Sequence, residues 1–302
     1  MSGTLTEGDA TAGLSQAQSE WAASFCGVAM DGAPDPAAVA KPKTGASPPP
    51  DPKVAKAQDT AKKVDGMADA DLQKMSSADK VALLKDIKAA GKPTGDLRKA
   101  QIKIFRNMQL DPDFKKREAA RADKAADEVK DDPDVNAAAS GWAKLSKDQK
   151  IKAVKRVMEA QCKQLGLPVP PILPYDKPAD PNGTVEDGNY DPSDGKLHFN
   201  TNPDANKTFT DAMDTAVHET SHAYQNDIVK RLKDGKIKPG DPDYAQAEMF
   251  AANDDGDDYI QPTEDMAAYV AQPEENHARI VAADYIDKIQ KKLTGPAAAK
   301  KP

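Results

Sequence analysis

The chain has 302 residues, of which 38% are hydrophobic, 30% charged and only 5% aromatic. This composition is polar for a chain folded along its whole length, so we expect part of it to lie outside any hydrophobic core. The formal net charge of -7 argues against nucleic acid or an anionic membrane as the main partner. No apolar run approaches the roughly 18–20 residues of a transmembrane helix.

The N-terminus and the two cysteines bear on where the protein works. Residues Met1 to Ala10 contain neither the basic stretch nor the apolar core of a secretory signal peptide. We therefore expect a protein that is cytoplasmic, or that leaves the cell by a route that does not read such a signal. Cys26 and Cys162 stand far apart and lack the spacing of metal ligands. Two reduced thiols are the default expectation, although one disulfide between them is also compatible with the sequence.

The first part of the chain predicts an arm followed by helices. Residues 1–50 are rich in Ala, Gly, Ser, Thr and Pro, which is typical of a flexible or polyproline-like linker. Residues 51–135 carry helical signals, and the clearest helices begin at Ser77, Gly95 and Asp111. No group of residues there suggests chemistry, and the many charges are most simply a solvated surface. We expect a helical accessory region.

A second region begins near residue 136. Ser146 and Gln149 form a capping box, which predicts a helix that closes at Gly166. The prolines between 168 and 174 then require an extended chain.

A β-hairpin is predicted next. Two strand-like segments, 188–190 and 196–200, flank a Pro-Ser-Asp-Gly turn. Leu197 and Phe199 alternate with polar neighbours, which is the pattern of a half-exposed strand. His198 lies in that alternation, so we expect it to face outward and not to be a ligand.

The central motif of the chain is His218-Glu219-x-x-His222. On a helix, residues i and i+4 lie one above the other, so the two imidazoles can meet one Zn²⁺. Glu219 sits one step round the helix, where it can contact a metal-bound water rather than the metal. The chain holds only 4 His, and a chance match is expected in roughly a few of every thousand such chains. Two exposed histidines on a solvated helix face are the weaker interpretation.

The segment around the motif has the pattern of an amphipathic helix. Thr208 and Asp211 predict its start, and Gly235 with the Lys-Pro-Gly at 238–240 predicts its end. The apolar positions that recur at helical spacing are Phe209, Ala212, Met213, Ala216, Val217, Tyr224 and Ile228. Such a stripe buries the helix while its middle carries the histidines, as a metal site requires.

Further helices are expected at 242–253 and from Pro273 to about Leu293, before a tail at 296–302. The acidic stretch 253–258 lacks the residue order of a calcium-binding loop and its later bidentate Glu. We predict a solvated turn there.

A catalytic zinc normally takes three protein ligands and a water, so a third ligand is expected after His222. Glu264 and Glu275 share the pattern Pro-x-Glu-x-x-Ala. Proline suits a first helical turn, and the Glu then points back toward the preceding helix. In one continuous helix the two would share a face, so spacing alone does not separate them.

From Trp142 to about Tyr285 the chain resembles the zincin-type, gluzincin-like metallopeptidase domains of bacterial polymorphic toxins and secretion-system effectors. The matching motifs are Trp-x-x-Leu-Ser from Trp142, Gly-x-Tyr from Gly188, Leu-His-Phe-Asn from Leu197, Thr-Ala-Val-His-Glu-Thr-Ser-His-Ala-Tyr-Gln from Thr215, and Tyr-Val-Ala-Gln-Pro-Glu-Glu-Asn-His-Ala from Tyr269. The resemblance is most specific at the His-Glu-x-x-His core. It implies an α+β, predominantly helical fold with a zincin-like catalytic domain at 136–295, which combines the metal helix with a small antiparallel sheet.

The resemblance also implies the roles of individual residues. In such domains the third ligand is a Glu in a Tyr-x-x-Gln-Pro-x-Glu-x-x-Ala setting, which matches Glu275 better than Glu264. Zinc would then be held by His218, His222 and Glu275. Glu219 would be the general base of the zinc-activated water that attacks a peptide carbonyl.

Further expectations concern the surroundings of this site. Tyr269 or Tyr224 is expected to assist the oxyanion, and the strand 197–200 to pair with an extended substrate. His277 lies two positions after Glu275, so one helix face does not present both squarely. A surface histidine is predicted, with a donor to the transition state as the alternative.

Two other interpretations remain open. The first keeps the hydrolase and makes it a toxin or effector exported by a dedicated secretion system, with a host protein or peptidoglycan peptide cross-links as substrate. Its partners would include a component of the secretion machine and an immunity protein. The second is a non-catalytic, zinc-stabilised binding module. Glu219 counts against it, because a purely structural site needs no base.

Overall fold

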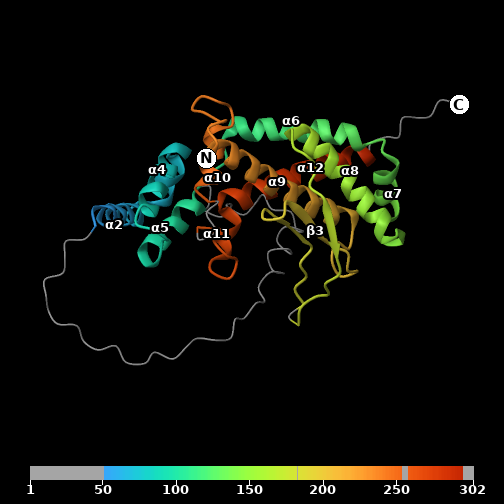
Figure 1. Ribbon diagram of the computed structural model, residues 1–302, viewed down its shortest axis with the longest axis horizontal. Helices are drawn as coiled ribbons and strands as arrows, with labels where there is room; N and C mark the ends of the chain where they lie inside the picture. The colour runs from blue at the N-terminus through green and yellow to red at the C-terminus, as the bar shows by residue number, and fades with distance from the viewer. Residues whose placement is uncertain (1–50, 182, 254–257, 295–302) are drawn as a thin grey trace, which may run out of the picture.

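The computed structural model describes residues 51–181, 183–253 and 258–294. The arm expected at 1–50, with Cys26, most of the acidic turn and the tail beyond 295 lie outside this part. The described residues are mostly helical and contain one three-stranded mixed sheet (Figure 1). The α+β, predominantly helical class is therefore confirmed. No helix in the described ranges is both long and apolar enough to cross a membrane.

The helices are α2 (Pro52–Asp65), α3 (Asp69–Lys74), α4 (Ser77–Lys88), α5 (Gly95–Arg106), α6 (Pro112–Val129), α7 (Pro133–Gly141), α8 (Lys147–Leu165), α9 (Phe209–Lys233), α10 (Tyr244–Ala251), α11 (Met266–Ala271) and α12 (Pro273–Thr294), with a 3-10 turn η1 (Trp142–Lys144). The strands are β1 (Ile172–Tyr175), β2 (Gly188–Asp191) and β3 (Lys196–Asn200).

Local sequence signals set the ends of the two helices that matter most for the site. Ser146 and Gln149 form the capping box of α8, and Gly166 ends that helix in the left-handed conformation, with a φ of 70°. Thr208 and Asp211 form the capping box of α9. All of these were predicted, because each depends on hydrogen bonds within one turn of the chain.

Two details of the N-terminal region differ from the prediction. The residue that caps α4 is Ser76 and not Ser77, and its hydroxyl accepts the N–H of Asp79. Helix α7 was not predicted. It begins directly after Asp132, whose carboxylate accepts the N–H groups of the first turn.

The sheet is mixed, so the predicted antiparallel sheet is wrong. Strand β3 lies in the middle, parallel to β1 and antiparallel to β2. Strands β2 and β3 are consecutive arms of a hairpin and run antiparallel. Strand β1, which follows α8, runs in the same direction as β3 and pairs with its other edge. Since β3 has a partner on both sides, the prediction that strand 197–200 pairs with a substrate is also wrong.

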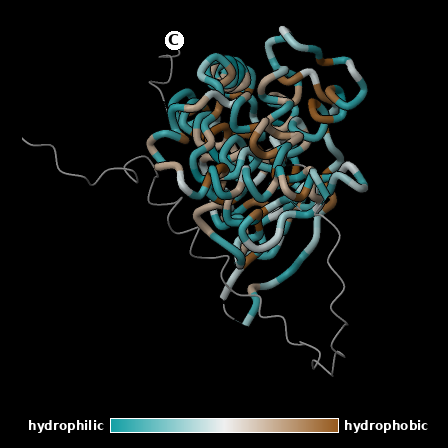
Figure 2. The backbone as a smooth tube through the Cα atoms, turned by 90° about the vertical axis from the view of Figure 1, so that its left-hand side faces the viewer, coloured by the Kyte–Doolittle hydropathy of each residue, from teal (hydrophilic) through white to brown (hydrophobic). Residues whose placement is uncertain are grey.

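Two hydrophobic clusters meet on α9. The first packs α2, α4, α5 and α10 against Tyr224, Ile228 and Val229 in the second half of α9. The second packs α7, α8, β3 and α12 against its first half. In Figure 1 the N-terminal helices and α7–α8 accordingly lie at opposite ends, with α9 and α12 between them. Figure 2 shows brown hydrophobic segments interspersed with teal hydrophilic ones along the coils of the described chain.

The predicted boundary near residue 135 does not coincide with a gap between these clusters. The second half of α6 belongs to the second cluster, together with α8 and α12. Its first residues, with Phe114, belong to the first cluster. Helix α6 therefore ties the N-terminal helices to the rest of the described chain.

Strand β2 lies so close to α9 that residue 188 has no room for a side chain. A Cβ on Gly188 would lie 2.7 Å from the carbonyl oxygen of His198 and 2.8 Å from Cγ2 of Thr215. Gly188→Ala therefore forces β2 away from both β3 and α9, and we expect a loss of about 1–3 kcal/mol in the free energy of unfolding. Urea denaturation measures it. The exposed neighbour Asn189 is the control, and Asn189→Ala should change the value by less than about 0.5 kcal/mol. Equal values for the two variants would contradict the close packing.

Candidate metal centre

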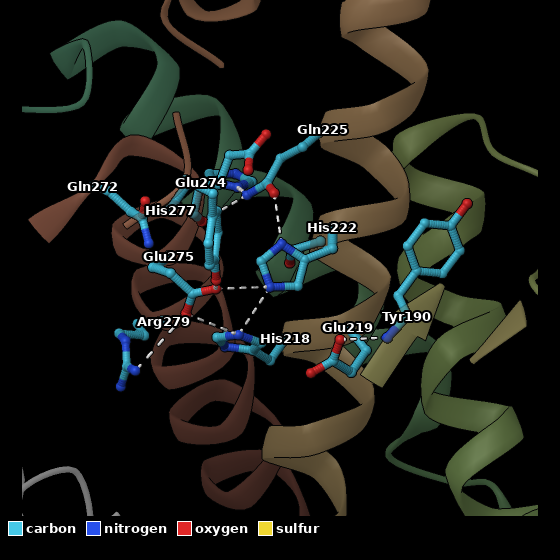
Figure 3. Close-up of polar contacts among 12 residues, drawn as sticks. Tyr190, His218, Glu219, His222, Gln225, Gln272, Glu274, Glu275, His277 and Arg279 are labelled. Atoms are coloured by element: carbon cyan, nitrogen blue, oxygen red, sulfur yellow. Dashed lines mark hydrogen bonds and ion pairs between the residues drawn. The ribbon is translucent and has the colours of Figure 1, made fainter. Parts of the chain in front are cut away.

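His218 and His222 lie one turn apart on α9 and present their rings to the same side (Figure 3). Their ring centroids are 4.8 Å apart, and their Nε2 atoms are separated by 3.1 Å. His218 is only 8% exposed. The rise of the α-helix fixes this arrangement, because residues at i and i+4 are neighbours on one face.

Glu275 completes the cluster from the first turn of α12, which packs against α9. Its carboxylate is buried, with Oε2 3.5 Å from Nε2 of His218 and Oε1 3.4 Å from Nε2 of His222. One ligand atom from each of the three residues lies within 4.8 Å of the others. The donor set is thus two imidazole nitrogens and one carboxylate oxygen.

The other predicted ligand, Glu264, lies outside this cluster. Its carboxylate accepts two hydrogen bonds from Arg98, at 2.6 and 2.5 Å. The two glutamates are not on one continuous helix either. Gln272 is extended, with a ψ of 149°, and separates α11 from the start of α12 at Pro273.

Without a metal, the charges of the cluster compensate one another as an ion pair between Glu275 and the histidines. Burial alone would raise the pKa of Glu275, but its contacts with His218 and His222 outweigh burial and hold this pKa well below its ordinary range. Burial alone would lower the pKa of His222, but Glu275 outweighs it and raises this pKa to about 10. Oε2 of Glu275 accepts no hydrogen bond from the described residues, although it is buried. An ionised oxygen in that position is costly unless it meets positive charge.

A glutamine orients the ring of His222. Oε1 of Gln225 lies 2.7 Å from Nδ1 of His222, while its Nε2 donates to the carbonyl of Glu274 at 2.7 Å and to Nδ1 of His277 at 2.9 Å. Because the amide oxygen only accepts, Nδ1 of His222 carries the proton. Its Nε2 faces the cluster and offers a lone pair once the imidazolium has lost the proton on that nitrogen, which is the arrangement that outer partners give to metal-binding histidines.

His277 is buried, so the prediction of a surface histidine is wrong. It is 1% exposed, and its ring packs against Phe114 and Phe250. Burial, followed by the nearby charge of His222, lowers its pKa to about 3. Helix spacing did not reveal this, because α12 has neighbours on several sides.

Glu219 lies beside the cluster and not in it. Its Oε2 accepts the backbone N–H of Tyr190 at 2.7 Å (Figure 3). Burial raises its pKa, against the opposing effects of His218, His222 and that N–H. A carboxylate with a raised pKa is a stronger base than an exposed one.

A cavity of about 370 Å³ opens over these residues. Its walls include β2, Tyr259 and Tyr269. Of the two tyrosines expected at the site, only Tyr269 lines the cavity. The prediction for Tyr224 is wrong, because its side chain is 1% exposed and its hydroxyl accepts from Arg121 at 3.2 Å within the hydrophobic cluster.

Tyr259 is a member of the site that was not predicted. Its hydroxyl donates to Oε1 of Glu275 at 2.6 Å. The two residues are 16 positions apart with an extended break between them. No local pattern in the sequence predicts a hydrogen bond between two residues so placed.

A second group of potential ligands lies on the hairpin, where Asp191, Asp194 and His198 offer atoms within 4.8 Å of one another. The carboxylates of Asp191 and Asp194 already accept the N–H groups of Ser193 and Lys196 in the turn. Contacts within the hairpin thus account for this group. His198 is half-buried, and Nε2 lies 3.2 Å from Asp194.

Searches against protein-family models, curated proteins and solved structures find no match for this chain. The residues around the cavity are therefore the observations that point to a function.

Proposed function

We propose that the chain is a zinc-dependent peptidase in which His218, His222 and Glu275 hold the metal and Glu219 is the general base. One observation carries the proposal: three metal-binding side chains converge at the wall of an open cavity that also contains a buried carboxylate of raised pKa. This combination is typical of catalytic zinc sites with a zincin-like arrangement.

The residues present fit zinc. Two imidazoles and one carboxylate form a common ligand set of catalytic zinc, which leaves a coordination position for water or substrate. His222 would release its Nε2 proton when zinc binds. The buried Oε2 of Glu275 accepts no hydrogen bond from the described residues, although it lies 3.5 Å from Nε2 of His218 and 3.8 Å from the guanidinium of Arg279, so it has a lone pair for zinc. Zinc bound there would supply a Lewis acid that polarises a carbonyl and lowers the pKa of water.

Glu219 is suited to proton transfer. Its Oε2 is held by Tyr190, which leaves Oε1 as the oxygen that receives a proton. It would accept the proton of the attacking water and pass it to the leaving amine. The raised pKa supports this role, because proton transfer is most efficient when the pKa of the base approaches the working pH.

The edge of β2 is suited to hold an extended peptide. The carbonyls of Asp187 and Asp191 accept from Asn200 and Gly195, so the backbone groups of Gly188 and Tyr190 point away from β3. Both residues line the cavity. The N–H of Tyr190 already donates to Glu219, so a substrate strand at this edge would pair with the other backbone groups of Gly188 and Tyr190. The role expected of strand 197–200 thus passes to its neighbour.

The biological setting is also part of the proposal. A toxin or effector exported by a dedicated secretion system would act on a host protein or on peptidoglycan peptides, and its producer would need an immunity protein. The motifs from Trp142 to Tyr285 support this setting by resemblance.

A non-catalytic module is the less favoured function. Structural zinc sites are normally closed by four protein ligands. Here a cluster of three adjoins an open cavity, and Glu219 is available as a base.

The zinc content of the purified protein tests the metal centre. After mild dialysis, elemental analysis should find about one zinc per chain, as one catalytic site requires. His222→Ala should lose most of it, because this substitution removes one of the proposed ligands. His198→Ala is the matched control and should retain it, because this histidine belongs to the hairpin group. A wild-type protein that takes up no zinc on reconstitution would refute the proposal.

A further inference from the structure

The segment 258–265 connects the N-terminal helices to the metal centre. Arg98 of α5 donates four hydrogen bonds to it. Two reach the carboxylate of Glu264, at 2.6 and 2.5 Å, and one each reaches the carbonyls of Asp258 and Tyr259, at 3.1 and 3.0 Å. A bidentate arginine–carboxylate pair is geometrically specific, and here the same guanidinium also holds two backbone groups.

Other residues of α4 and α5 support the same segment. Gln101 is fully buried and donates to the carbonyl of Asp258 at 3.2 Å. Lys88 lies 2.6 Å from the Asp258 carboxylate, and Arg106 pairs with Asp265 at the far end. The N-terminal helices therefore hold this segment at both ends.

The side chain of Tyr259 leaves this segment toward the metal centre. Its hydroxyl donates to Oε1 of Glu275 at 2.6 Å, and its ring packs edge-on against Tyr269, with centroids 6.0 Å apart. Tyr259 makes both contacts, because its backbone carbonyl accepts from Arg98 and its phenol donates to Glu275. A shift of the backbone at 259 would move both.

The hydrogen bond from Tyr259 restricts what the Glu275 carboxylate can do. Oε1 accepts the phenol O–H, whereas the buried Oε2 accepts no hydrogen bond from the described residues and has His218 at 3.5 Å and Arg279 at 3.8 Å as its charged neighbours. The phenol thereby fixes the rotation of the carboxylate and keeps Oε2, the oxygen without a hydrogen bond, turned toward His218. Such outer partners orient ligands and raise metal affinity.

We infer that helices α4 and α5 complete the metal centre, with Arg98 positioning Tyr259 and Tyr259 positioning Glu275. The inference rests on the metal centre proposed above. It assigns a role to the helical accessory region, which the sequence left without one. Arg98 and Tyr259 are positioning residues that act through Glu275.

The test is a double-mutant cycle on zinc affinity, measured by competition with a chromogenic chelator. We expect Tyr259→Phe to weaken zinc binding by about 10–100-fold, as loss of an outer partner does, and Arg98→Ala to weaken it by a similar factor. Because both act on one bond, the double variant should bind zinc about as weakly as the weaker single variant. Arg98→Lys keeps the positive charge but loses the planar guanidinium that binds the carboxylate through two N–H groups, so it should also weaken zinc binding.

Lys85→Ala is the matched control. Lys85 of α4 forms a 2.8 Å ion pair with Glu248 of α10, which also crosses from the N-terminal helices but does not touch the segment. It should leave zinc affinity unchanged. If the losses of zinc affinity in Arg98→Ala and Tyr259→Phe multiply in the double variant, the two residues act independently and this inference is wrong. An equal loss of zinc affinity in Lys85→Ala would also refute it, but neither result would touch the metal centre. A wild-type protein without zinc affinity would instead overturn the metal centre itself.

Discussion

Glu219→Gln is expected to retain its zinc and to hydrolyse an unfolded protein substrate about 10²–10⁴-fold more slowly than the wild type. The substitution keeps the shape of the side chain and an oxygen that can accept the N–H of Tyr190. It removes only the capacity to take up a proton. Zinc should stay because Glu219 lies outside the cluster of His218, His222 and Glu275.

The control for this variant is Glu186→Gln. Glu186 lines the same cavity, but its carboxylate pairs with Lys177 at 2.7 Å and not with a histidine. The same chemical change should therefore leave the rate within a few-fold of the wild type. Equal rates for Glu219→Gln and the wild type would exclude the proposed mechanism.

The same pair of variants tests the biological setting. If the chain is a toxin, its production in the cytoplasm or periplasm of a bacterium should slow growth. Glu219→Gln should relieve that effect, and Glu186→Gln should not. A growth defect that persists in Glu219→Gln would separate toxicity from hydrolysis.

Glu275→Ala is expected to lose its zinc, whereas Glu264→Ala keeps most of it. The first substitution removes the only carboxylate of the cluster. Its effect on the zinc dissociation constant should exceed the roughly 10–100-fold typical of an outer partner. Chelator competition on both variants measures it.

Glu264→Ala acts at a distance. It removes the carboxylate to which Arg98 donates two hydrogen bonds, but Arg98 keeps its hydrogen bonds to the carbonyls of Asp258 and Tyr259. Zinc affinity should therefore fall by about tenfold at most, the lower end of the range for outer partners. Loss of zinc from Glu264→Ala together with its retention in Glu275→Ala would reverse the assignment of the third ligand.

Local interactions explain what the sequence determined by itself. The capping boxes at Ser146 and Thr208 depend on hydrogen bonds within one helical turn, so they could be identified from a few adjacent residues. The pairing of His218 with His222 is equally local, because the helical rise fixes the distance between i and i+4. The inward positions of Leu197 and Phe199 follow from the alternation of a strand.

Only the tertiary structure decided the rest, because it depends on how distant elements pack. Glu275 meets the histidines because α12 breaks from α11 at Gln272 and lies against α9. The contact of Tyr259 with Glu275 and that of Arg98 with Tyr259 join segments with no shared periodicity. Sequence spacing specifies neighbours within one element, whereas contacts between elements depend on chain breaks and packing angles that no local pattern encodes.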